Sequence, residues 1–327
     1  MITPEPLVVT LVKLVDCIPM PPAPSKRGRG RPRYYTDRLF LKALVIMIVQ
    51  HLHKVHELLT VLDEPTAEMQ MLRSLLCEGG RYPTRRTWER RLKALPASLP
   101  AQIGCLGRYL VALMQPWLTY GRAVAIDSTI LLANGGVWHQ KHRAKGEVPH
   151  TSIDTEAHWT KSGWHGWCYG WKLHLVATVA AIWIPLAADL TAANVADNEA
   201  ALALLAELPA EVRFVTGDLH YNAPNVRACC ERNDRILVAT QRGPYPHTDD
   251  GVEVRRIFHK LRSLAIENFN EHFKGIFDGH GQVPTKGLRN TKRWALGAVL
   301  LYQLAILYRF QQDLTPCVGL KAFLKAA

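Results

Sequence analysis

The run that most constrains the fold is Arg122–Leu132, with the sequence RAVAIDSTILL. It is apolar and rich in β-branched residues, which is typical of a strand. One aspartate, Asp127, lies at its centre. A charge in an apolar strand is costly unless it is paired or bound to a metal ion. We therefore treat Asp127 as either a buried hydrogen-bond acceptor or a functional carboxylate.

The segments after this strand predict a sheet flanked by helices. Residues 133–165 are polar and predict a long loop. Strand patterns cover 171–179, 182–187, 212–216 and 235–240, and helical patterns cover 194–208, 223–233, 254–277 and 294–310. The order of three strands, helix, strand, helix, strand, helix indicates an α/β fold with a mixed sheet.

The first 118 residues predict helices instead. Apolar residues recur at helical spacing in residues 7–18, 37–53 and 85–95, and a helix over 57–77 is expected to break at Pro65. Prolines interrupt the chain over 19–24, and the densest basic cluster follows over 25–33.

Composition bounds the class of protein. Lys and Arg number 40 against 28 Asp and Glu, a net charge of +12, which favours a polyanionic partner. None of the seven cysteines has C-x-x-C spacing, so zinc ribbons and thioredoxin-like sites lack their ligand pair. Glu5 and Asp16 do not suit a signal peptide. The apolar run 295–308 is shorter than the ~20 residues of a membrane span. We expect a soluble cytoplasmic protein without a membrane partner.

Two further carboxylates stand out by position. Asp218 follows a strand, where open α/β sheets place their sites. Glu267 shares a helical stripe with Ser263, Asn270 and Lys274, opposite an apolar stripe. Converging carboxylates suit Mg²⁺, and two such ions ~4 Å apart catalyse phosphodiester chemistry. The plainer alternatives are a turn cap at Asp218 and a solvated charge at Glu267.

Five segments together carry a resemblance to a known family. They are AIDST (125–129), WCYGWKLHL (167–175), DLTAANVADNEA (189–200), VTGDLHYN (215–222) and IENFNEHFK (266–274). The chain over about residues 80–312 resembles insertion-sequence transposases of the DDE type, in the bacterial group that contains insertion-sequence families four and five. The resemblance implies an RNase H-like core that binds divalent metal, cleaves transposon ends and joins them to target DNA.

The resemblance also assigns site residues. Asp127 and Asp218 match the two catalytic aspartates and Glu267 the glutamate, and the three would bind two Mg²⁺ ions, with Mn²⁺ as a substitute. Lys274 matches the lysine of the tyrosine–arginine–glutamate–lysine signature and would contact DNA. The tyrosine position is Lys260 and the arginine position is Ser263, with Arg262 beside it as a further candidate DNA contact. This departure leaves Glu271 as a rival for the glutamate.

Two residues on the strand beside Asp127 are further candidates. Lys172 and His174 alternate along it and so point to the same face. They would contact DNA phosphate or form a solvated sheet face. Asp197 follows nearby and reads as a helix N-cap or first-turn acid.

Two basic segments are candidate DNA contacts. Residues 26–33 resemble an AT-hook, whose extended Gly-Arg-Pro core fits a narrow minor groove; the alternative is a flexible basic linker. The cations of this arm are Lys26, Arg27, Arg29, Arg31 and Arg33. A short helix carrying Arg85, Arg86 and Arg90 would be a recognition helix for the transposon ends, or a basic surface behind Trp88 and Leu92.

The sequence thus predicts a metal-dependent DNA transposase acting on double-stranded DNA at the ends and the target. We expect an N-terminal helix (1–24), the basic arm (25–34), a helical DNA-binding and assembly domain (35–118), an RNase H-like catalytic domain (119–315) and a C-terminal tail (316–327). Synapsis of two ends implies a homodimer, and the protein would associate with the bacterial nucleoid. The alternatives are a non-transposing metal-dependent nuclease and a domesticated DNA-binding protein.

Overall fold

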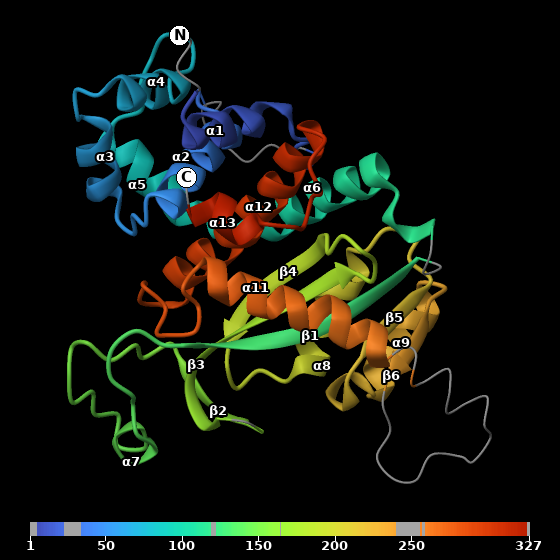
Figure 1. Ribbon diagram of the computed structural model, residues 1–327. Coiled ribbons are helices and arrows are strands. Elements are labelled where there is room, and N and C mark those ends of the chain that lie inside the picture. The colour runs from blue at the N-terminus through green and yellow to red at the C-terminus, as the bar shows by residue number, and fades with distance from the viewer. Residues whose placement is uncertain are drawn as a thin grey trace, which may run out of the picture.

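A computed structural model describes residues 5–22, 34–118, 122–163, 165–239, 256 and 259–325. Figure 1 shows a group of helices beside a twisted sheet, with one long helix joining the two parts. The candidate DNA-binding arm over 26–33 lies outside the described residues.

The N-terminal part is helical, as expected. Pro65 lies between two of its helices, where the break was predicted. The helices are α1 (Leu7–Cys17), α2 (Asp37–Val49), α3 (Val55–Leu62), α4 (Ala67–Leu75), α5 (Arg85–Ala94) and α6 (Leu99–Met114), with 3₁₀ turns at η1 (Leu95–Ala97) and η2 (Pro116–Leu118).

The sheet contains six strands among the described residues. They are β1 (Ala123–Leu132), β2 (His158–Ser162), β3 (Gly166–Thr178), β4 (Pro185–Ala192), β5 (Phe214–Gly217) and β6 (Ile236–Ala239). The order is β2-β3-β1-β5-β6, and β4 also pairs with β3. β3 is antiparallel to β1, β2 and β4, whereas β5 is parallel to β1 and β6. This confirms the predicted α/β fold with a mixed sheet.

The prediction of a continuous loop over 133–165 was wrong. This segment contains the helix α7 (Gln140–Arg143) and the strand β2, which forms a hairpin with the first part of β3. All five residues of β2 are exposed or partly exposed, so the strand has no apolar run to mark it. β4 likewise extends to Ala192, beyond the predicted 187.

Helices cover both faces of the sheet. α8 (Asp197–Ala206) packs against β1, β3 and β4, and α9 (Pro224–Arg232) packs against α8 and β6. α6 and α12 (Leu288–Gln311) pack against β4, and α11 (Asn268–Ile276) crosses the sheet in front of β1 (Figure 1). The remaining elements are the 3₁₀ turn η3 (Leu219–Tyr221), the π-helical stretch η4 (Ser263–Glu267) and α13 (Leu320–Lys325).

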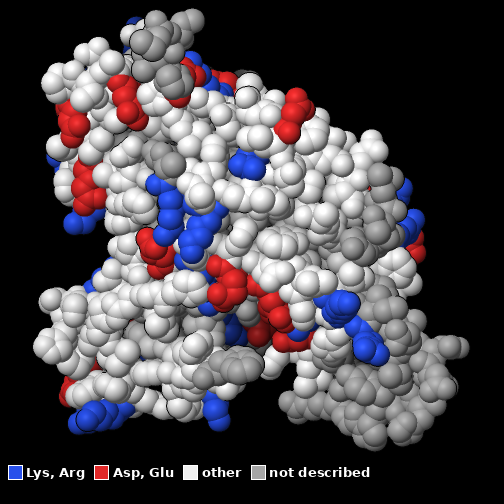
Figure 2. All heavy atoms as spheres, viewed as in Figure 1, with Lys and Arg blue, Asp and Glu red and all other residues white. Residues whose placement is uncertain are grey.

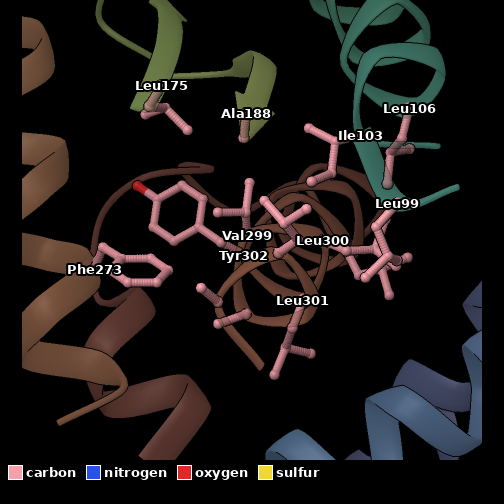
Figure 3. Packing of buried hydrophobic residues seen from close by; sticks show 14 of the residues in the cluster. Leu99, Ile103, Leu106, Leu175, Ala188, Phe273, Val299, Leu300, Leu301 and Tyr302 are labelled. Atoms are coloured by element: carbon pink, nitrogen blue, oxygen red, sulfur yellow. The ribbon is translucent and has the colours of Figure 1, made fainter. Parts of the chain in front are cut away.

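α12 is the central helix of the core. Tyr302, Val299 and Leu300 lie between the sheet residues Leu175 and Ala188 and the α6 and α11 side chains (Figure 3). Because α1, α2 and α6 also pack on α12, the N-terminal helices and the sheet share one hydrophobic core. The C-terminal segment is part of the same body, since α13 packs on α11 and α12.

One polar side chain is buried in α12. Gln303 donates from Nε2 to the carbonyl oxygens of Ile103 (2.9 Å) and Pro185 (2.8 Å). A buried amide is stable only when it is hydrogen-bonded. Gln303 therefore joins α12 to α6 and to the start of β4, which explains the polar residue inside an apolar run.

All seven cysteines are free thiols. Within the described residues, no helix has both the length and the apolar character that crossing a bilayer requires.

Candidate active site

Asp127 and Asp218 lie at the same level on neighbouring strands. In the parallel β1–β5 pair, Ala125 is the register partner of Thr216. Asp127 and Asp218 each lie two residues beyond this pair, Asp127 in the middle of β1 and Asp218 directly after β5. The two aspartates are therefore at the same level of the sheet. The carboxylate of Asp218 also accepts a 2.8 Å bond from the backbone N–H of His220 and caps η3.

The electrostatics of Asp127 reflect its neighbours. Burial raises the pKa of this carboxyl to about 7; the Arg262 guanidinium opposes that rise, whereas the charges of Asp218 and Glu267 add to it. The charges of the other two predicted carboxylates therefore reach Asp127, and one arginine compensates their effect in part.

Helix α11 supplies groups to the same place. Asn270 is buried and donates from Nδ2 to Oδ2 of Asp127 at 3.3 Å. Burial lowers the pKa of Lys274, and the charges of Glu271 and Asp127 act in the opposite direction. The polar helical stripe predicted from the sequence thus faces Asp127. Asn270 belongs to this stripe, but the sequence did not reveal its hydrogen bond to Asp127.

Glu267 is held by an arginine five residues earlier. Nη2 of Arg262 donates to Oε1 of Glu267 at 2.9 Å, and this arginine side chain is only 12% exposed. The segment between them, Ser263–Glu267, is π-helical. A π turn bonds residues i and i+5 instead of i and i+4. Arg262 therefore lies on the face that residue 263 would occupy in a regular α-helix.

This turn accounts for the imperfect signature. The expected arginine position held Ser263, and the arginine stood one residue earlier. The extra residue of the π turn brings that arginine to the glutamate. Sequence spacing alone assumes a regular helix and could not show this.

The rival glutamate has a different setting. Glu271 is 70% exposed and lies 3.8 Å from the His280 ring, on the α11 side of the turn. Glu267 is also exposed, at 49%, but its charge acts on Asp127 and it pairs with Arg262.

A polar cluster lies on the opposite face of the sheet. Successive residues of β1 point to opposite faces, so Ser128 points away from the Asp127 side. Its Oγ donates to Oδ1 of Asp197 at 2.8 Å. The same carboxylate lies 3.1 Å from Nζ of Lys172 and 3.6 Å from Nδ1 of His174. Asp197 thus ties β1 and β3 together directly behind Asp127.

This cluster decides two alternatives that the sequence left open. Lys172 is only 12% exposed and His174 is 1% exposed, so they do not form a solvated sheet face. His174 also contacts Oγ1 of Thr191 at 2.8 Å. The N-cap of α8 is Ala196, and Asp197 is the first-turn acid. The sequence held one signal that could have predicted this cluster: Lys172 and His174 alternate along a strand, and an acid, Asp197, follows nearby.

Tyr221 is a further residue that sequence reasoning missed. Burial raises its pKa well above the ordinary value, and the charges of Asp127, Asp197 and Asp218 add to the rise. The Tyr221 hydroxyl is therefore near enough to all three carboxylates for their charges to act on it.

The comparison with protein families is decisive here. The family model described as a transposase DDE domain matches residues 121–304, more than half of the chain. The chain belongs to this DDE transposase family. The matched range contains all three predicted carboxylates of the transposase.

Two other comparisons give no further information about this transposase. No protein of curated function matches the chain. Two solved structures, a Mos1 transposase paired-end complex with left transposon end and a pre-cleavage Mos1 transpososome, are 14% and 13% identical with TM-scores of 0.23 and 0.20. The first covers 85% of this chain and 80% of its own, and the second 86% and 80%. Superpositions this loose do not bear on the fold, which rests on the strand order.

The donor set of the transposase suits a hard divalent cation. No three His, Cys, Asp or Glu side chains among the described residues close on one point to hold an ion by themselves. Mg²⁺ needs only one or two protein carboxylates, because waters and phosphate oxygens complete its shell. Asp127 and Asp218 carry oxygens of this kind, and a cation beside them would offset the charge of Asp218 that raises the pKa of Asp127.

The α5 arginines of the transposase are exposed. Arg85 pairs with Glu89 at 2.9 Å, whereas no acidic partner of Arg86 or Arg90 is present among the described residues. Trp88 and Leu92 are fully buried on the other side of the helix. The helix therefore presents a basic surface over an apolar one.

Proposed function

We propose that this transposase binds the terminal inverted repeats of its insertion sequence, cleaves the ends by metal-dependent hydrolysis and joins the 3′-hydroxyls to target DNA. The observation that carries the proposal is the placement of Asp127 and Asp218 at the same level of neighbouring strands, together with the effect of the Glu267 charge on the pKa of Asp127. The five segments that resemble the group containing insertion-sequence families four and five support assigning the protein to that group.

Each residue has a role that its setting supports. Asp127 and Asp218 would hold the metal, and Glu267 would complete the site from the helix. Two Mg²⁺ ions, or Mn²⁺, would supply activation of the attacking oxygen and stabilisation of the leaving oxygen. Asn270 orients Asp127, and Arg262 orients Glu267. Lys274 is close enough to act on Asp127 and would bind a phosphate there.

The chemistry balances without a covalent protein intermediate. In the first step a water oxygen bonds to phosphorus, the bond to the 3′-oxygen breaks, and that oxygen takes a proton to become a 3′-hydroxyl. In the second step this hydroxyl loses its proton and attacks a phosphorus of target DNA, releasing a new 3′-hydroxyl. One P–O bond forms and one breaks in each step.

DNA contacts outside the site complete the proposal. The arm of Lys26, Arg27, Arg29, Arg31 and Arg33, together with Arg85, Arg86 and Arg90, would bind the ends. Lys172 and His174, held by Asp197, would support the sheet beneath the DNA. A homodimer would bring two ends together, and the net charge of +12 suits association with the nucleoid.

The test is an assay with the DNA that flanks the coding segment. Full-length protein is incubated with labelled ends, target plasmid and Mg²⁺ or Mn²⁺, and Glu267→Gln is compared with Glu271→Gln. We expect wild type and Glu271→Gln to cut and join, and Glu267→Gln to bind without cutting. If Glu267→Gln cuts and Glu271→Gln does not, the catalytic glutamate is Glu271. If wild type binds the ends tightly without cutting them, the enzymatic proposal is contradicted.

A further inference from the structure

A basic groove lies between the N-terminal helices and the start of α12, away from the carboxylates. Its volume is about 1150 Å³, and residues from the start of α3, from α5, from η1 and from 286–293 line it. On this side the outline of the molecule is hollowed, between the lobe that carries α3 to α5 and the lobe that carries α7 (Figure 2). Two parts of the chain far apart in sequence therefore form one surface.

The N-terminal wall of the groove is cationic. Lys54, Arg85, Arg90 and Lys93 line it. The one acid on this wall, Glu89, is paired with Arg85. Arg90 and Lys93 are exposed, and the described residues hold no acidic partner for either.

The opposite wall is cationic too. It carries Lys286, Arg289, Lys292 and Arg293 from the start of α12. Its acid, Glu156, is already engaged, because it accepts a 2.9 Å bond from the backbone N–H of Leu288. The groove thus has eight Lys and Arg against two Glu, and both glutamates have partners within the protein. Two of the cations also pair with acids outside the lining, Lys292 with Asp189 at 2.5 Å and Lys54 with Glu57 at 3.7 Å, which leaves a clear excess of positive charge.

One of these cations is buried. Arg293 is 8% exposed, and its Nη2 donates to the backbone carbonyl of His53 at 2.9 Å. No carboxylate among the described residues pairs with it. A buried guanidinium with only a neutral partner is costly, and an anion in the groove would offset that cost. This contact also fixes the two walls relative to each other.

We propose that this groove binds the sugar–phosphate backbone of a DNA duplex, so that α5 and the start of α12 contact one continuous DNA segment. The inference rests on the proposed function for the identity of the nucleic acid. Rows of Lys and Arg contact phosphates without reading bases, and they set the register of a duplex. The groove would therefore hold the transposon end in a fixed position relative to the catalytic sheet.

Binding measured without catalysis tests this directly. Fluorescence anisotropy of full-length protein with a duplex of the terminal sequence, in EDTA, compares wild type with Arg90→Ala/Lys93→Ala/Arg289→Ala. The matched control is Lys141→Ala/Lys145→Ala/Arg232→Ala, which removes the same charge from exposed sites outside the groove. We expect the groove variant to lose about tenfold or more in affinity at ~100 mM salt, and its log–log salt slope to fall by roughly 0.9 per lost contact.

A second variant guards against misfolding. Arg289→Glu reverses one exposed charge in the first turn of α12, where an acid is favourable to the helix. It is expected to fold like wild type and to weaken binding. Equal affinity of wild type and groove variants for the duplex would overturn the assignment of the groove as a DNA-binding surface, and so would an equal loss of affinity in the matched control. End cleavage by wild type would then leave the proposed function intact. Tighter groove-dependent binding of single-stranded RNA would overturn the DNA assignment.

Discussion

Arg262 and Glu267 form a 2.9 Å ion pair across a π-helical turn. The pair places a largely buried cation beside a carboxylate cluster that includes Asp127. π turns inside helices occur frequently at functional sites. Figure 2 shows acidic side chains in a row across the middle of the face that α11 crosses, with Lys and Arg nearby.

The first prediction concerns this arginine. Arg262 lowers the pKa of Asp127, which burial otherwise raises to about 7. In Arg262→Gln the pKa of Asp127 rises further, so a larger fraction of the carboxyl is protonated at neutral pH. The acid limb of the pH–rate profile for end cleavage should move to higher pH, and a rate lowered equally at every pH would contradict this role.

The second prediction concerns metal binding. If Asp127 and Asp218 hold a cation, Mg²⁺ should stabilise the folded state by mass action. At about ten times the Kd the stabilisation is ~1.4 kcal/mol, a rise of roughly 2–4 °C in Tm. Asp127→Asn/Asp218→Asn should show no rise in calorimetry. The same rise in the double variant would place the binding site elsewhere.

The third prediction concerns Asp197. Its charge is matched by Lys172 at 3.1 Å behind the sheet. Asp197→Asn keeps an acceptor for Ser128 but leaves the lysine without its counter-charge, which costs about 3 kcal/mol for a largely buried pair. Adding Lys172→Met should recover much of the free energy of unfolding lost in urea titrations. Additive losses in the double variant would show that the two groups do not interact.

The fourth prediction concerns His174. Burial lowers its pKa to about 4, although the nearby Asp197 charge opposes this. An unfolded chain takes up the proton near pH 6.5, so this stability is full above pH 6.5 and is lost as the pH falls towards 4. Between pH 7.5 and 5 wild type should lose on the order of 2 kcal/mol more than His174→Gln. Equal losses in both proteins would exclude His174 as the titrating group.

The sequence predicted the features that depend on local pattern. The strand around Asp127, the strand ending at Asp218 and the helix of Glu267 follow from periodicity. The sequence analysis missed β2 because its side chains are polar and partly exposed. The strand therefore lacks the apolar pattern by which buried strands are recognised.

Contacts between distant segments could not be read in advance. The hydrogen bond from Ser128 to Asp197 joins β1 to α8, and the β1–β3 register brings Lys172 and His174 to the same carboxylate. The π turn at Glu267 changes the spacing on which a helical pattern is read. The basic groove joins residues 53–97 to residues 286–293, which only the packing of α12 brings together.

The most direct test of the account is strand transfer by Asp218→Asn. The assay uses the native flanking DNA and Mg²⁺, and the matched control is Asp313→Asn, an exposed aspartate after α12 with φ 53°, a conformation that Asn accepts. We predict that Asp218→Asn binds the ends like wild type but loses cleavage and joining by at least about 10³-fold, while Asp313→Asn keeps full activity. Full strand transfer by Asp218→Asn would contradict the carboxylate site.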